Sequence, residues 1–124
     1  MGFAHHSGFA TWFEMGRSEM LRLNGISYRE FEEQGHLLPV VDLRIRYKKP
    51  ARYDDILRLV SHMTEITRAK IVFEYKLFRD DELLATGRTV NACIDRKGDL
   101  QPIPESIFQA FKITPPKRVR MHRI

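Results

Sequence analysis

The spacing of apolar residues changes along this chain from the period of a helix to the period of a β-strand. Between residues 7 and 24 the large apolar side chains recur at helical spacing, at Phe9, Trp12, Phe13, Met20 and Leu23. After Pro39 they alternate with charged residues, as at Val41, Leu43, Ile45 and Tyr47. The first spacing predicts an amphipathic helix, and the second predicts a strand buried on one face. We therefore expect one long helix followed by β-structure.

Short turns separate the other expected elements. A second helix is predicted over residues 28–34, because Ser27 can cap its start and Gly35 can end it. Further strands and a last helix are expected over residues 56–66, 70–78, 83–94 and 104–111. The turns between strands are too short for helical crossovers, so the sheet should be antiparallel. The expected fold class is α+β, with a curved antiparallel sheet wrapped around the long central helix.

The size and composition of the chain limit its organisation. With 124 residues it can form one hydrophobic core, and we expect one domain over residues 1–112 and a basic tail over residues 113–124. The single cysteine, Cys93, cannot form an internal disulfide and is typical of a reducing cytoplasm. No apolar run is long enough to cross a bilayer, and the N-terminus does not read as a secretory signal. The five histidines lack metal-ligand spacing, so we expect no metal.

The net charge of +5 comes from the end of the chain. Residues 112–124 contain five basic residues and no acidic one, and the rest of the chain holds sixteen of each sign. A short basic segment that contains prolines is more often a solvated end than an arm that binds nucleic acid. The charge pattern therefore predicts no nucleic-acid partner.

A polar turn leads into the aromatic start of the long helix. The segment His5-His6-Ser7-Gly8 directly precedes Phe9 and the run Trp12-Phe13-Glu14. Backbone N–H groups at a helix N-terminus have no intrahelical partner, and they favour an anion or a polarised carbonyl. The pattern indicates a binding site at the start of this helix.

Residues in two segments resemble a known family. These are Met1-Gly2-Phe3-Ala4-His5-His6-Ser7-Gly8-Phe9 with Trp12-Phe13-Glu14 and Arg17, and then Tyr47-Lys48-Lys49-Pro50-Ala51-Arg52-Tyr53-Asp54-Asp55. The chain is similar over nearly all of residues 1–111 to acyl-CoA thioesterases of the hotdog fold. The resemblance is to the 4-hydroxybenzoyl-CoA thioesterase-like branch, which includes the short-chain enzymes encoded with the Tol-Pal system.

The resemblance implies a mechanism at the start of the long helix. The thioester carbonyl would accept a hydrogen bond from the backbone N–H of His6, and a carboxylate would act on water as a base or on the carbonyl as a nucleophile. In the family this carboxylate is an Asp in the pattern D-x-x-G. The glycine matches Gly2, so the Asp would fall before Met1, together with the family's first strand. Gly8 also departs from the family, which usually has Asn or Ser there.

The resemblance also implies roles for individual residues. Catalytic roles are implied for His6, Gly8 and Glu14. Contacts with the substrate are implied for His5, Ser7, Phe9, Trp12, Thr67, Arg68 and Lys70. Arg68 and Lys70 would meet the phosphates of coenzyme A. Purely structural roles remain as alternatives, because His6 can cap the helix, Glu14 can pair with a neighbouring Arg, and the aromatic residues can belong to the core.

The expected function is hydrolysis of an acyl-CoA thioester to a free acid and CoA. It needs no cofactor, since coenzyme A is part of the substrate. One alternative is a non-catalytic module that binds acyl-CoA or acyl-carrier protein, and another is a hotdog dehydratase acting on a 3-hydroxyacyl thioester. The long charged strand over residues 38–49 would otherwise be an open edge, so we expect it to pair across a two-fold axis in a homodimer; a dimer of two such dimers is the alternative assembly.

Overall fold

The computed structural model describes residues 6–50 and 56–112, with side chains in the first range from Thr11 onward. The helices in these ranges are α1 (His6–Leu23), α2 (Tyr28–Glu33) and α3 (Glu105–Ala110). The strands are β1 (Val40–Tyr47), β2 (Leu57–Ile66), β3 (Ile71–Arg79), β4 (Glu82–Asn91), β5 (Cys93–Ile94) and β6 (Leu100–Gln101). The expected basic tail, residues 113–124, lies outside the described residues.

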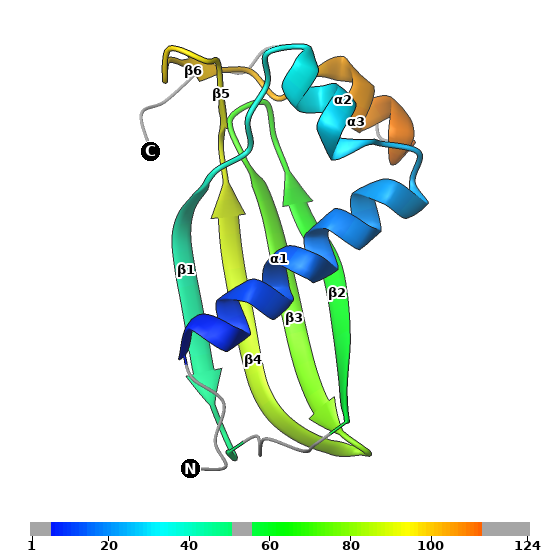
Figure 1. The fold of residues 1–124 in the computed structure, drawn as a ribbon, viewed down its shortest axis with the longest axis vertical. Coiled ribbons are helices and arrows are strands. Elements are labelled where there is room, and N and C mark those ends of the chain that lie inside the picture. Colours follow the sequence, from blue (N-terminus) through cyan, green and yellow to red (C-terminus); the bar gives the residue numbers. More distant parts are fainter. Residues whose placement is uncertain (1–5, 51–55, 113–124) are drawn as a thin grey trace.

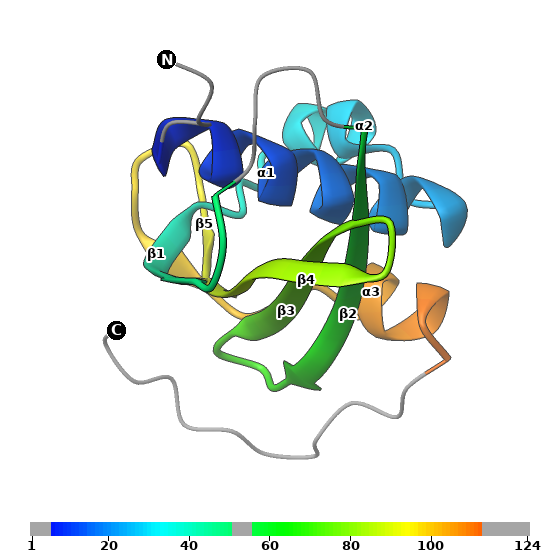
Figure 2. The same cartoon turned by 90° about the horizontal axis from the view of Figure 1, so that it is seen from below.

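The four long strands form one antiparallel sheet in the order β1-β4-β3-β2. Helix α1 runs obliquely across one face of this sheet (Figure 1). A view turned by 90° shows the sheet curving beneath α1 (Figure 2). The predicted α+β fold, with an antiparallel sheet around a long helix, is confirmed.

Two glycines allow α1 to approach the sheet closely. The ring of Phe13 stacks on the ring of Tyr75 in β3, with 4.3 Å between the centroids, and it lies against Gly87 in β4, where a Cβ would overlap it. Gly16, one turn further along α1, faces Leu59 and Ser61 of β2 so closely that a Cβ would come within 2.9 Å of the Leu59 side chain. At each point the side chain of one element fills the space that the glycine of the other leaves open, so helix and sheet pack closely around the aromatic core.

The predicted ends of α1 and α2 are confirmed by their capping geometry. After α1, Gly25 has a φ of +83°, and the N–H of Ile26 donates to the Leu21 carbonyl at 2.9 Å. A left-handed residue at this position is what commonly ends a helix. The hydroxyl of Ser27 then accepts a bond from the N–H of Glu30 and caps α2, which ends before Gly35 with its φ of +90°.

The predicted strand over residues 83–94 is divided in the structure. Strand β4 ends at Asn91, and β5 pairs with β6 in a separate two-stranded sheet. The N–H of Ala92 donates to the carbonyl of Pro39 at 3.2 Å, and the N–H of Leu37 donates to Ile94 at 3.0 Å. The chain therefore leaves the main sheet after Asn91 because it pairs with the segment that precedes β1.

Strands β1 and β2 are the edges of the main sheet among the described residues. The predicted buried face of β1 is only partly formed: Ile45 packs against the core, but Val41, Leu43 and Tyr47 are exposed by 42%, 38% and 47%. Since apolar side chains remain uncovered along this edge, β1 offers more surface for a partner than the alternating sequence suggests.

Candidate active site

The start of α1 presents backbone N–H groups at one end of the helix. Because His6 is the first helical residue, the N–H groups of residues 6–9 have no partner within the helix. Figure 1 shows this end of α1 on the β1 side of the sheet. His5 lies outside the described residues, as do the side chains of His6, Ser7 and Phe9, and Gly8 is a helical residue of α1. The backbone geometry therefore fits the role implied for the His6 N–H, while the roles of these side chains stay predictions.

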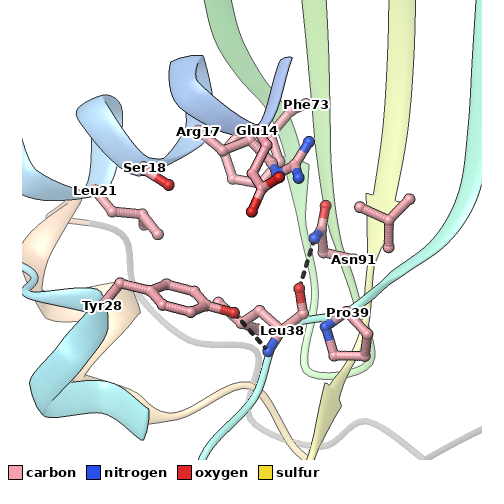
Figure 3. Close-up of a pocket in the computed structure, with 10 residues that line it drawn as sticks. Glu14, Arg17, Ser18, Leu21, Tyr28, Leu38, Pro39, Phe73 and Asn91 are labelled. Atoms are coloured by element: carbon pink, nitrogen blue, oxygen red, sulfur yellow. Dashed lines mark hydrogen bonds between the residues drawn. The ribbon is translucent and has the colours of Figure 1, made fainter. Parts of the chain in front are cut away.

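A cavity of about 300 Å³ lies further along α1, between this helix and the segment that leads into β1. Figure 3 shows the residues around it. Helix α1 contributes one face, and α2, β3, β4 and the loop before β1 supply the other walls. The lining residues are Glu14, Arg17, Ser18, Leu21, Tyr28, Leu38, Pro39, Val40, Phe73 and Asn91. From His6 to Glu14 the helix rises about 12 Å, so the cavity opens roughly two turns from the helix start.

Two hydrogen bonds link Asn91, the Leu38 backbone and Tyr28 along one wall of the cavity. Asn91, which is 2% exposed, donates from Nδ2 to the carbonyl of Leu38 at 2.8 Å. The N–H of Leu38 donates to the Tyr28 hydroxyl at 3.4 Å. Burial is the main influence that raises the pKa of Tyr28. These contacts hold the loop before β1 against α2 and the end of β4.

Arg17 and Glu14 supply opposite charges to the cavity. Arg17 donates from Nη1 to the Tyr75 hydroxyl at 3.2 Å, and that hydroxyl shares a 2.8 Å hydrogen bond with Thr89. Glu14 is exposed and forms no ion pair with any residue that the structure describes. The ion pair between Glu14 and a neighbouring Arg, which the sequence left open as an alternative, is therefore not formed among the described residues. The structure leaves its carboxylate at the cavity, where it can meet a substrate or a water.

The other expected contact residues lie elsewhere. Trp12 packs against the hydrophobic core and does not line the cavity. Thr67 accepts bonds from the N–H groups of Ala69 and Lys70, both at 3.1 Å, and so shapes the β2–β3 turn. This turn lies near α3, at the end of the sheet away from the start of α1 (Figure 1).

The two cations of this turn have partners within the chain. Arg68 donates to Glu105 at 2.7 Å and lies 5.1 Å from the centroid of the Phe108 ring. Lys70 is 3.5 Å from the Glu65 carboxylate. Within one copy of the chain, the structure does not bring them to the cavity or to the start of α1.

The sequence did not identify Tyr28, Leu38 or Asn91 as site residues. The available signal was Asn91 itself, an amide between the apolar residues Val90 and Ala92 of a predicted strand. A polar side chain inside an apolar strand needs a partner when it is buried. Which partner it finds depends on the loop around Leu38, 53 positions earlier in the chain.

The described residues hold neither a membrane-spanning helix nor a cluster of metal ligands. None of the described helices combines the length and hydrophobicity needed to cross a membrane. The same residues contain no group of three or more His, Cys, Asp or Glu side chains that could hold a metal ion.

Comparisons with known proteins converge on one family. The model of the thioesterase superfamily matches residues 1–86. The acyl-CoA thioesterase YbgC of Haemophilus influenzae is 33% identical over 113 residues, covering 89% of this chain and 82% of that protein.

Solved structures give the same result. The hypothetical protein TT1821 from Thermus thermophilus has a TM-score of 0.83 and 32% identity, covering 90% of this chain and 86% of that chain. The DHNA-CoA thioesterase from Staphylococcus aureus has a TM-score of 0.82 and 31% identity, covering 90% and 78%.

Proposed function

This chain belongs to the thioesterase superfamily, and from that membership we propose that it hydrolyses an acyl-CoA thioester to a free acid and CoA. The resemblance stated from the sequence is thereby confirmed at the level of the family and of the hotdog-like fold. The observation that supports the proposal most directly is the placement of a partly apolar cavity beside α1, with a carboxylate on its wall and the free N–H groups of the helix start two turns away.

The thioester carbonyl is proposed to lie at the start of α1. During hydrolysis, negative charge develops on the carbonyl oxygen when water adds to the carbon. The N–H of His6 can donate to this oxygen, and the positive end of the helix dipole favours the same charge. These interactions strengthen as the charge grows, so they lower the barrier rather than merely hold the substrate. The acyl group can then extend along α1 toward the cavity.

A carboxylate is proposed to remove the proton from the attacking water. The family pattern D-x-x-G, matched at Gly2, assigns this role to an Asp three positions ahead of Gly2, outside this sequence. Glu14 is the second candidate, because its carboxylate lines the cavity and has no ion pair among the described residues. It lies about two turns of α1 from the His6 N–H, so it would act only on a thioester whose carbonyl lies at the cavity and not at the start of α1. Either group would work as a general base, which is typically worth about 10²–10⁴-fold in rate.

The experiment measures thiol release from a panel of acyl-CoAs. Glu14→Gln removes the base and preserves the shape of the side chain. Glu19→Gln is the matched control, because Glu19 lies on the same helix but pairs with Arg22 outside the cavity. A loss of about 10²-fold or more in the first variant alone assigns the role to Glu14. An unchanged rate in Glu14→Gln assigns the role of general base to the Asp ahead of Gly2. A form of the chain extended by a strand and that Asp should then release thiol about 10²-fold faster than the present chain.

The same assay separates the alternatives. A module that only binds acyl-CoA or acyl-carrier protein would release no thiol, and a dehydratase would convert a 3-hydroxyacyl thioester to an enoyl thioester. Thiol release without an enoyl product supports hydrolysis. Absence of thiol release from every acyl-CoA, in the present and the extended form, would contradict the proposed function.

The nucleotide end of coenzyme A is proposed to meet Arg68 and Lys70. Both are cations at the β2–β3 turn, and they would have to exchange their bonds to Glu105 and Glu65 for phosphate oxygens. Changing both to Ala should weaken binding of acyl-CoA about tenfold and barely affect a short pantetheine thioester, which has no nucleotide phosphates. Equal losses for the two substrates would contradict this placement.

A further inference from the structure

Arg17 is a half-buried cation without a counter-ion among the described residues. Its Nη1 donates to the Tyr75 hydroxyl at 3.2 Å, and no described carboxylate lies within ion-pair distance of it. Charged side chains that are partly withdrawn from water are usually paired, because an unpaired charge loses hydration without compensation. The guanidinium therefore has room for an anionic partner.

Two buried hydroxyl groups hold this guanidinium in place. Tyr75 and Thr89 are each 1% exposed, and their hydroxyls share a hydrogen bond of 2.8 Å. Because a guanidinium can only donate, the Tyr75 oxygen accepts from Arg17, and the hydrogen of the phenol can go to Thr89. The Tyr75 ring is fixed in turn by its stacking on Phe13. The phenol thus orients the guanidinium and leaves its charge in place.

The guanidinium belongs to the wall of a partly apolar cavity. Arg17 lines the cavity of about 300 Å³ together with Leu21, Leu38 and Phe73. Figure 3 shows Arg17 and Glu14 on the α1 side of this cavity, across from Leu38. An apolar cavity of about 150 Å³ is enough for benzene, so a ring or a short chain fits here beside a charged group.

The charges around the cavity favour an anion with a single charge. Arg17 is the one cation among the residues that line it, so a phosphate dianion would keep a charge without compensation. A carboxylate has one charge, and its two oxygens match the N–H groups of a guanidinium. Glu14 also lines the cavity and opposes an anion, but it is exposed, so water screens its charge more than that of half-buried Arg17.

We propose that Arg17 makes this cavity a binding site for a carboxylate that carries an apolar body. The carboxylate accepts from N–H groups of the guanidinium that Tyr75 does not use, and the apolar body lies against Leu21 and Phe73. Such a carboxylate has two sources. One is the free acid that hydrolysis releases, and the other is the far end of an acyl group with a second carboxylate. These sources rest on the proposed function, whereas the site follows from the surroundings of Arg17.

The first test compares phenylacetate with phenylacetamide, which has nearly the same shape but no charge. Titration calorimetry gives the dissociation constant of each ligand. We expect phenylacetate to bind about tenfold more tightly, because a charge-assisted hydrogen bond to a guanidinium is stronger than a neutral one. Equal dissociation constants, or no binding of phenylacetate at millimolar concentration, would overturn the inference.

Variants of the charged residues separate the charge of Arg17 from its packing. The preference for phenylacetate should disappear in Arg17→Gln and persist in Arg17→Lys, which keeps the charge. It should increase in Glu14→Gln, which removes the opposing carboxylate. Arg22→Gln is the matched control, because Arg22 lies on the same helix but pairs with Glu19 and does not line the cavity. A preference that survives Arg17→Gln, that Arg17→Lys abolishes, or that Arg22→Gln alone removes would overturn the inference.

Two non-hydrolysable CoA thioethers identify the source of the carboxylate. They carry a 7-carboxyheptyl or a 7-carbamoylheptyl group on sulfur. This chain can run along α1, since the helix rises about 16 Å from His6 to Arg17 and long helical side chains point back toward the helix start. Tighter binding of the carboxyl form assigns the site to acyl groups with a second carboxylate. A preference confined to phenylacetate assigns it to the free acid.

None of these four ligands contains a thioester, so their binding does not depend on the proposed hydrolysis. A preference for phenylacetate without thiol release from any acyl-CoA would refute the hydrolysis and support the site at Arg17. Thiol release with equal binding of phenylacetate and phenylacetamide would do the reverse.

Discussion

At the scale of residues, the guanidinium of Arg17 is bonded to a phenol and not to a carboxylate. Tyr75 receives this bond at 3.2 Å and is itself 1% exposed, and burial is the main influence that raises its pKa. The phenol therefore stays neutral at physiological pH. Because no described carboxylate pairs with Arg17, its charge remains available to the cavity. Tyr75 and Thr89 thus position a cation at the site without neutralising it.

Cys93 gives a prediction about pH at the same scale. Burial raises the pKa of its thiol from 9.0 to about 11. Between pH 9 and pH 11 the Cys93 thiol loses its proton in the unfolded chain but keeps it in the folded chain. The contribution of this thiol to stability is therefore complete below pH 9 and is lost as the pH rises toward 11. The difference in the free energy of unfolding between the wild type and Cys93→Ala should shrink by about 2 kcal/mol over this interval.

Urea denaturation at pH 8, 9, 10 and 11 measures this difference. Subtracting the values for Cys93→Ala removes the contributions of the tyrosines and lysines that titrate in the same range. The native thiol should also react slowly with a disulfide reagent at pH 8, since the thiolate is the reactive form. A constant difference across this range would show that the thiol is not buried as described.

At the scale of elements, the contact between α1 and the sheet decides the shape of the site. The cavity lies between the middle of α1 and the loop before β1, so any shift of the helix changes its walls. Phe13 against Gly87 and Gly16 against β2 fix the height of the helix above the sheet. A packed interior cannot take up even one extra methyl group here without moving one of these elements.

Gly87→Ala should therefore destabilise the fold by about 2–3 kcal/mol, because the new methyl group would overlap the Phe13 ring. Gly16→Ala should cost less, since its nearest neighbour is the hydroxyl of Ser61, which can rotate away. Urea denaturation measures both changes. Phe13→Leu in the Gly87→Ala background should recover part of the loss, and a lack of recovery would show that another contact causes it.

At the scale of the whole molecule, the exposed edge of β1 favours a second copy of the chain. Val41, Leu43 and Tyr47 leave apolar surface on this edge, and no other described strand pairs with its outer side. An open, partly apolar edge is usually covered by pairing, by another element or by charge. We expect β1 to pair with its two-fold mate, which would bring the two copies of the α1 start near the joint.

Light scattering at micromolar concentration should give twice the mass of one chain. The double variant Val41→Lys with Leu43→Lys should give the mass of a single chain, because like charges would then face each other across the joint. Thr64→Lys is the matched control, since Thr64 is exposed on β2 at the opposite edge of the sheet. A wild-type monomer, or dissociation by the control alone, would contradict this assembly.

Local patterns in the sequence were sufficient to predict the three helices, the four long strands and the fold class, but not the short strands β5 and β6. The spacing of Phe13, Met20 and their neighbours predicts α1 because a helical period is a property of consecutive residues. The ends of α1 and α2 follow from Gly25 and Ser27 for the same reason, since capping involves only nearby backbone groups. Turns too short for crossovers then leave an antiparallel sheet as the available arrangement.

Only the tertiary structure decided the cavity and the end of β4. Arg17 and Tyr75 are 58 positions apart, and Leu38 and Asn91 are 53 apart, so no local pattern connects them. Periodicity states which face of an element is buried, but it does not state which side chain of another element lies opposite. That depends on the register of the strands and on how closely α1 approaches the sheet, and both are fixed by packing over the whole fold.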